Sequence, residues 1–132
     1  MYSKFGQFID GKWLEAEKKE TYEVINPATE EIIGNASKAS SADVQKALKS
    51  AQQGLEIWKN TDPWTRSNII RKIADLIREK KEVLAKWMAM ENGKPLLEGL
   101  AEASGSADIF EWNSEETKRI FGQTAVSYTH LT

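Results

Sequence analysis

Two pairs of glutamates have a spacing that could support acid–base chemistry. Glu98 and Glu102 are four residues apart, as are Glu111 and Glu115, so each pair would share one face of a helix. Two neighbouring carboxylates can act as a general acid and a general base. Glutamates at this spacing are more often solvated, and Glu115 also precedes Arg119 by four residues, the spacing of an ordinary surface ion pair. We therefore interpret both pairs as surface residues.

Gly93 and Lys94 form the Gly-Lys pair of a phosphate-binding loop, but their neighbours do not fit one. Such a loop has serine or threonine directly after the lysine, and it has another glycine five residues before the glycine of the Gly-Lys pair. Here Pro95 follows Lys94, and no glycine lies five residues before Gly93. Gly99 and Gly105 do not form a dinucleotide-binding fingerprint, because no strand precedes them. We identify no catalytic and no cofactor-binding residue in this sequence.

The composition excludes several classes of function. The 132 residues include no cysteine and a single histidine, His130, so the chain has no thiol nucleophile, no disulfide framework and no histidine-rich metal site. Eighteen basic and 20 acidic residues give a net charge of −2, which argues against binding to nucleic acid or to an anionic membrane surface. No apolar run is long enough to span a membrane. We expect a cytoplasmic globular piece with 40% hydrophobic residues.

The first forty residues have the pattern of two β-hairpins. Residues 8–9 and 12–14 are short apolar segments around Asp10 and Gly11, and an Asp-Gly pair accepts the positive φ angles of a two-residue turn. The second hairpin pairs residues 22–25 with residues 32–33 across a turn that begins at Asn26-Pro27, and we expect it to end at Gly34-Asn35.

From Ser41 onward the apolar residues recur at helical spacing. We expect Ser41 to cap a first helix, and Asp62 to cap a second helix that begins at Pro63 and ends at Gly93. The short link between them predicts that these two helices pack antiparallel. A third helix is expected from about residue 95 to 121, with Gly122 ending it.

The third helix is unusual in its middle, residues 101–107, which are mostly small. Such a stretch has a poor helix propensity and is useful where another backbone or a ligand must come close. We favour tight helix packing. Overall, the sequence predicts an α+β fold class, with two N-terminal β-hairpins followed by three α-helices.

Several short stretches have a recognisable order and spacing over about residues 7–124. They are residues 8–13 (FIDGKW), residues 24–29 (VINPAT), Trp58 followed by residues 62–63 (DP), residues 91–96 (ENGKPL), and residues 111–112 (EW) followed by residues 118–122 (KRIFG). Together these stretches resemble the start of the aldehyde dehydrogenase superfamily, and the last helix is most similar to the succinate-semialdehyde and related semialdehyde dehydrogenases.

The resemblance implies that this chain is the opening part of an α/β aldehyde dehydrogenase-like fold. Residues 1–40 would then be the β-hairpin segment of an oligomerisation sheet, and residues 41–124 a three-helix part that packs on a nucleotide-binding domain absent from this sequence. The family oxidises aldehydes with NAD or NADP, using a cysteine thiolate and a glutamate-activated water. The resemblance therefore implies an aldehyde substrate, here a semialdehyde, and a homodimer or homotetramer. The chain itself is expected to be non-catalytic and to bind no cofactor.

The resemblance implies roles for two sets of residues in this chain. Several members hold a monovalent cation with backbone carbonyls beside the Asn-Pro turn and with the acid before Asn-Gly-Lys-Pro, which correspond here to Val24, Ile25 and Glu91. Many members have aspartate where this chain has Glu91. The third helix lines the substrate tunnel in the family, and Ala101 and Gly105 would face it. For Val24, Ile25 and Glu91 an alternative remains open, namely that Glu91 is an ordinary acid at the end of a helix that lies near strand carbonyls and holds no ion.

The end of the chain departs from the family pattern. Residues 125–132 resemble translated adapter sequence, so we interpret them as a non-native tail that includes His130. A different class of function also remains open, namely a stand-alone α+β protein-interaction module. Such a module would bind its partner through an exposed sheet edge and through Trp13 or Trp64.

Overall fold

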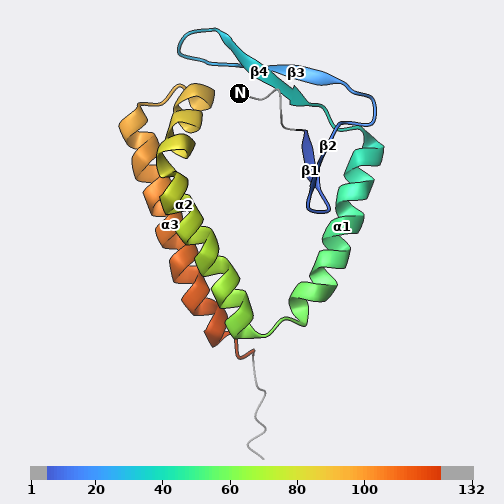
Figure 1. The fold of residues 1–132 in the computed structure, drawn as a ribbon, viewed down its shortest axis with the longest axis vertical. Coiled ribbons are helices and arrows are strands. Elements are labelled where there is room, and N and C mark those ends of the chain that lie inside the picture. The colour runs from blue at the N-terminus through green and yellow to red at the C-terminus, as the bar shows by residue number, and fades with distance from the viewer. Residues whose placement is uncertain (1–5, 123–132) are drawn as a thin grey trace, which may run out of the picture.

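A computed structural model describes residues 6–122 of the chain. Helix α1 and the α2–α3 pair form two diverging arms, with the β3–β4 hairpin across their open end and the β1–β2 hairpin between the arms beside α1 (Figure 1). This order confirms the prediction of two hairpins followed by three helices. The elements are β1 (Gln7–Ile9), β2 (Lys12–Leu14), β3 (Thr21–Ile25), β4 (Ile32–Ser37), α1 (Ser41–Lys59), α2 (Pro63–Asn92), α3 (Leu96–Glu116) and the short 3₁₀ helix η2 (Thr117–Arg119).

The first hairpin forms around the Asp-Gly pair, as predicted. Asp10 has a φ of 55° and Gly11 a φ of 71°, which are the positive values that a two-residue hairpin turn requires. Phe8 lies opposite Trp13 in the antiparallel register, and their ring centroids are 5.1 Å apart. This aromatic pair contributes to the stability of a hairpin that has only three residues in each strand.

The second hairpin is longer than its apolar pattern indicated. Strand β4 continues to Ser37, which pairs with Thr21, so the expected end at Gly34-Asn35 was wrong. Backbone pairing with β3 extends the strand through residues whose side chains are small or polar. An irregularity between Val24 and Ile25 interrupts the register next to the turn. Each hairpin forms its own two-stranded sheet.

The N-terminus of α1 is held by a capping box centred one residue earlier than expected. Ser40, not Ser41, is the N-cap, and its hydroxyl accepts a hydrogen bond from the Asp43 backbone N–H at 3.2 Å. The Asp43 carboxylate accepts a hydrogen bond from the Ser40 N–H at 3.0 Å in return. Asp43 also accepts from the Glu17 N–H at 3.1 Å. The Asp43 carboxylate thus accepts hydrogen bonds from the N–H groups of both Ser40 and Glu17. Because a capping box pairs the N-cap with the residue three positions later, this placement of Asp43 makes Ser40 the cap.

Replacing Ser40 with alanine is expected to lower the free energy of unfolding by about 1 kcal/mol, because one N-terminal amide of α1 loses its acceptor. The matched control is Ser41→Ala at the exposed first helical position, which should change that free energy by less than about 0.5 kcal/mol. Urea unfolding followed by far-ultraviolet circular dichroism measures both. Equal losses in the two variants would contradict the capping assignment.

Helices α2 and α3 pack together over most of their length, whereas α1 diverges from α2 (Figure 1). The prediction that the first two helices pack antiparallel was therefore wrong. The facing side chains of α2 and α3 are small, so the two backbones can approach closely, while the larger apolar side chains of α1 stay exposed. The residues of α2 and α3 that are buried are Ser67, Ala74, Ala85, Gly99, Ala103, Ala107 and Ser114.

The third helix ends earlier than the sequence indicated. Helix α3 stops at Glu116 and tightens into η2, where the buried Thr117 donates its hydroxyl to the Asn113 carbonyl at 2.9 Å. Gly122 has a φ of 71°, three residues beyond the end of η2. None of the helices within residues 6–122 is long and apolar enough to cross a bilayer. The predicted tail at residues 125–132, including His130, lies outside the described residues.

Candidate functional site

The turn that follows one part of the predicted cation site lies close to the helix end that carries the other part. Val24 and Ile25 end β3, and Glu91 lies in the last turn of α2. A Cβ atom on Gly93, the residue that follows α2, would be only 2.9 Å from Cγ of Pro27. The turn after β3 therefore packs against the end of the helix that carries Glu91.

The chemistry at this position is that of hard oxygen ligands. The C-terminus of α2 presents the negative end of the helix dipole, and the Glu91 side chain is exposed beside it. Residues 6–122 contain no group of three or more histidine, aspartate or glutamate side chains that could hold a metal ion. A cation bound here would depend on backbone carbonyls and one carboxylate, all of which are oxygen ligands.

The small residues of α3 divide between two faces of the helix. Gly99, Ala103 and Ala107 recur every four residues and are buried against α2, which confirms tight helix packing for these positions. Ala101 and Gly105 are offset by two residues, about 200° around the axis, and both are exposed. A Cβ atom on Gly105 would have no neighbour within 4 Å. The structure thus leaves Ala101 and Gly105 on the outward face of α3.

That outward face also carries large apolar side chains. Leu97 is 79% exposed, Ile109 is 64% exposed and Trp112 is 69% exposed. Leu97, Ala101, Gly105 and Ile109 follow one another at four-residue intervals, so they form a single row along α3. This row is apolar, and the small residues Ala101 and Gly105 make its middle flat. Such a surface is suited to contact with further protein or with an apolar ligand.

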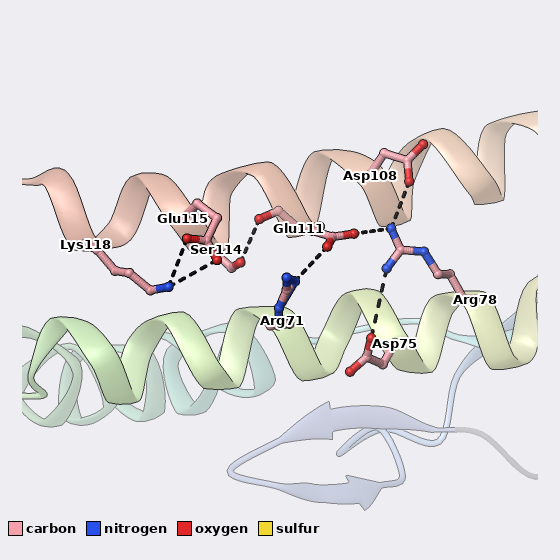
Figure 2. Close-up of polar contacts among 8 residues, drawn as sticks. All are labelled: Arg71, Asp75, Arg78, Asp108, Glu111, Ser114, Glu115 and Lys118. Carbon is pink, nitrogen blue, oxygen red and sulfur yellow. Dashed lines mark hydrogen bonds and ion pairs between the residues drawn. The ribbon is translucent and has the colours of Figure 1, made fainter.

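A network of ion pairs joins α2 to α3 at the edge of the packed faces (Figure 2). Arg71 binds the Glu111 carboxylate at 2.6 Å, and Arg78 binds both Glu111 and Asp108, the latter at 2.9 Å. Asp75, one turn before Arg78 on α2, lies 4.0 Å from the same guanidinium. Two arginines of one helix are thus tied to two acids of the other.

These ion pairs decide the role of the second glutamate pair. The hydrogen bond and charge of Arg78, with a smaller contribution from Arg71, hold the pKa of Glu111 below its ordinary value. The Lys118 ammonium likewise lowers the pKa of Glu115, with which it forms an ion pair at 2.9 Å. Carboxylates with lowered pKa values are poor general acids and bases near neutral pH. Glu111 and Glu115 are therefore structural partners.

One predicted ion pair forms with a different cation. Glu115 was expected to pair with Arg119, but it pairs with Lys118, and Arg119 pairs with Glu116 at 3.4 Å. The tightening of the chain from α3 into η2 changes the angular spacing of these side chains, so the four-residue rule for an α-helix no longer applies.

The first glutamate pair is also accounted for by the surface interpretation. Both carboxylate oxygens of Glu102 lie 2.6 Å from Nζ of Lys94, in the link between α2 and α3. Glu98 is exposed in the first turn of α3, where an acid interacts favourably with the helix dipole. Glu98 and Glu102 therefore have separate local roles.

A hollow along α3 and η2 does not have the features of an active site. All of its lining residues come from α3 and η2, and its carboxylates pair with neighbouring arginine or lysine side chains. The lining residues are Asp108, Glu111, Trp112, Glu115, Glu116 and Arg119.

The two tryptophans considered as interface anchors are both exposed, Trp13 by 56% and Trp64 by 66%. Trp13 pairs with Phe8, and Lys118 Nζ lies 4.8 Å from the Trp64 ring centroid. Each ring therefore already has a contact within the chain, and each still presents apolar surface.

Comparison with known proteins assigns the chain to a family. A sequence model described as the Aldehyde dehydrogenase family matches residues 13–132. The chain belongs to the aldehyde dehydrogenase family. Its backbone also superposes on a solved betaine aldehyde dehydrogenase from Staphylococcus aureus, crystallised with NAD+, with a TM-score of 0.88 and 30% identity over 95% of this chain and 26% of that one.

Curated relatives place this aldehyde dehydrogenase chain near enzymes named for semialdehydes. It is 39% identical over 117 residues to the glutarate-semialdehyde dehydrogenase of Pseudomonas aeruginosa, covering 89% of this chain and 24% of that enzyme. It is 36% identical over 116 residues to the NADP(+) succinate-semialdehyde dehydrogenase of Escherichia coli, with coverages of 88% and 24%. The chain thus spans about a quarter of the length of these relatives.

The described residues of this aldehyde dehydrogenase chain lack one feature of a dinucleotide-binding unit. A dinucleotide-binding unit needs a glycine-rich turn between a strand and a helix. Among the described strands, β4 is the one that leads into a helix, and Lys38, Ala39 and Ser40 connect it to α1. The sequence also contains no cysteine, so this chain supplies no thiolate nucleophile.

Sequence reasoning missed the ion-pair network and the link from Asp43 to Glu17. Arg71 and Glu111 are 40 positions apart, and Asp43 is 26 positions from Glu17. No local spacing rule applies at that separation. The signal present in the sequence was the spacing of Arg71 and Arg78, which are two turns apart and therefore share one face of α2.

Proposed function

We propose that this chain is the N-terminal part of an NAD(P)-dependent aldehyde dehydrogenase that oxidises a semialdehyde to the corresponding acid. The observation that carries the proposal is the 36–39% identity, over nearly nine-tenths of the chain, to enzymes named for glutarate and succinate semialdehyde. The substrate class is therefore a short aldehyde that ends in a carboxylate. The thiolate, the general base and the nucleotide site would lie in the remainder of the enzyme, so the 132 residues alone would be non-catalytic.

Each part of the chain would have a structural role in the whole enzyme. Residues 1–40 would add two hairpins to the sheet of a homodimer or homotetramer, and the open edges of these two-stranded sheets support this assignment. Residues 41–124 would pack on the nucleotide-binding domain. In support, several large side chains of α1 are 38–72% exposed and would need to be covered in a stable enzyme, namely Val44, Leu48, Leu55, Ile57 and Trp58.

The two local sites would serve the same enzyme. Ala101 and Gly105 would line the substrate tunnel, where the small size of both residues leaves room for the aldehyde; their exposed position on α3 supports this role. The carbonyls of Val24 and Ile25, with the Glu91 carboxylate, would hold a sodium or potassium ion, which the packing of Pro27 on Gly93 supports. The composition predicts the cytoplasm as the compartment.

A chimera tests the proposed function directly. The matching segment of the Pseudomonas aeruginosa enzyme is replaced by the 117 aligned residues of this chain, and NAD(P)H formation from glutarate semialdehyde is measured. We expect kcat/KM to stay within about tenfold of the parent, a change of ~1.4 kcal/mol, because no reacting group is exchanged. The unmodified 132-residue chain should form no NAD(P)H. A folded, oligomeric chimera without activity would refute the proposal.

A further inference from the structure

Gly93 meets two separate requirements at the junction between α2 and α3. Its φ of 67° lies in the left-handed region, which favours glycine at the end of a helix. Its missing side chain also makes room for a neighbour, because a Cβ atom here would be 2.9 Å from Cγ of Pro27 and 3.5 Å from the backbone N of Ala28. The second requirement is a contact with a different part of the chain.

The turn that contacts Gly93 is held by its own hydrogen bonds. The Asn26 N–H donates to the Glu31 carbonyl at 2.9 Å, and the Asn26 side-chain oxygen accepts from the Ala28 N–H at 2.9 Å. The Asn26 carbonyl accepts from the Glu30 N–H at 2.8 Å. Pro27 has a restricted φ within this turn. The pyrrolidine ring therefore meets Gly93 as part of a rigid unit.

The link on the helix side is anchored as well. Lys94 follows Gly93, and its side chain is only 21% exposed while its ammonium contacts both carboxylate oxygens of Glu102 at 2.6 Å. Glu102 lies in the second turn of α3. This ion pair ties the link that contains Gly93 to α3.

The position of this contact in the fold gives it a mechanical consequence. The covalent route from the β3–β4 hairpin to the α2–α3 pair runs along the whole of α1 and then through residues 60–62 (Figure 1). Helix α1 diverges from α2 and does not pack along it. The β3–β4 turn, at the opposite end of the two arms, reaches the α2–α3 link and closes the arrangement there.

We propose that the packing of Pro27 on Gly93 is a conformational clasp that fixes the β3–β4 hairpin against the α2–α3 pair. Without the clasp, the hairpin and α1 would swing relative to α2 and α3 while each element kept its secondary structure. The proposal concerns this chain by itself and does not rest on the proposed enzymatic function.

Distance measurements between two spin labels test the clasp. The sequence contains no cysteine, so Glu23→Cys on β3 and Lys86→Cys on α2, both exposed positions, give two unique labels in the 132-residue chain. Double electron–electron resonance is recorded with the labelled chain diluted in unlabelled chain, which suppresses distances between molecules. We expect one narrow distance distribution, and we expect Gly93→Ala to lose it and give a broad one.

The matched control is Gly122→Ala. Gly122 has a φ of 71°, close to that of Gly93, but a Cβ atom there would meet nothing within 4 Å. It therefore imposes the same backbone strain without touching the clasp, and we expect its distribution to stay narrow. If Gly93→Ala and Gly122→Ala broaden the distribution equally, strain alone explains the result and the clasp is refuted.

A second variant covers the case in which Gly93→Ala loses its helical circular dichroism. Pro27→Ala removes the ring but leaves the backbone at Gly93 unchanged, and we expect it to broaden the distribution while α2 and α3 stay helical. A narrow distribution in Pro27→Ala, centred on the distance of the parent chain, would overturn the proposal.

Discussion

Replacing Gly99 with alanine is expected to lower the free energy of unfolding of the chain by about 1–2 kcal/mol. A Cβ atom at this position would lie 2.9 Å from the Ala85 carbonyl oxygen and 3.2 Å from the Ala85 Cα. Both are backbone atoms of α2, so no side-chain rotation can relieve the clash and the helices must move apart. Overpacking of this kind costs about 1–3 kcal/mol, which exceeds the gain of about 0.8–1 kcal/mol in helix propensity.

Gly105→Ala in the same helix is the matched control, and its expected effect has the opposite sign. A Cβ atom at Gly105 would have no neighbour within 4 Å, so only the propensity gain remains and the chain should be stabilised by about 0.5–1 kcal/mol. Urea unfolding monitored by circular dichroism measures both changes. A stabilised Gly99→Ala variant would show that α2 and α3 do not approach as closely as the structure has them.

Acid is expected to remove a stabilising contribution of Asp43 over a defined pH range. Backbone hydrogen bonds from Ser40 and then Glu17 lower the pKa of Asp43 from 3.8 to about 2 in the folded chain. Because the folded pKa lies below the unfolded one, the contribution is fully present above the unfolded value of 3.8. It is lost as the pH falls toward the folded value of about 2.

Asp43→Asn isolates this contribution, because asparagine keeps an acceptor oxygen but has no charge to titrate. We expect the variant to unfold at lower urea than the parent chain at neutral pH. The difference between the two midpoints should then shrink as the pH falls from about 4 to about 2. A difference that stayed constant over this range would mean that the Asp43 carboxylate is not held by the amides of Ser40 and Glu17.

Much of the local structure could be predicted because the rules that produce it act over a few residues. Asp10 and Gly11 supply the positive φ angles of the first turn, Asp62 and Pro63 begin α2, and Gly93 ends it. The functional assignment was predictable for a different reason. The quoted stretches of residues 7–124 identified a family that the match over residues 13–132 then confirmed.

The N-cap of α1 and the end of α3 are intermediate cases. The sequence indicated a serine cap, but Ser40 and Ser41 are adjacent and both are good caps. The choice depends on the Asp43 carboxylate, which bonds to Glu17 from the preceding loop as well as to Ser40. At the other end, Thr117 is buried and the last turn tightens, so α3 stops at Glu116 although the apolar pattern continues to Phe121.

The sequence by itself determined the elements, their order and the family, because turn chemistry, capping and helical periodicity are local properties and the family motifs are contiguous. Only the tertiary structure decided that α2 pairs with α3 and not with α1, that Gly99 faces Ala85 while Gly105 faces outward, and that Arg71 and Arg78 bind Glu111. These outcomes depend on how the side chains of two segments pack against each other at close range. Such packing depends on both segments together, so it cannot be read from the sequence of either segment alone.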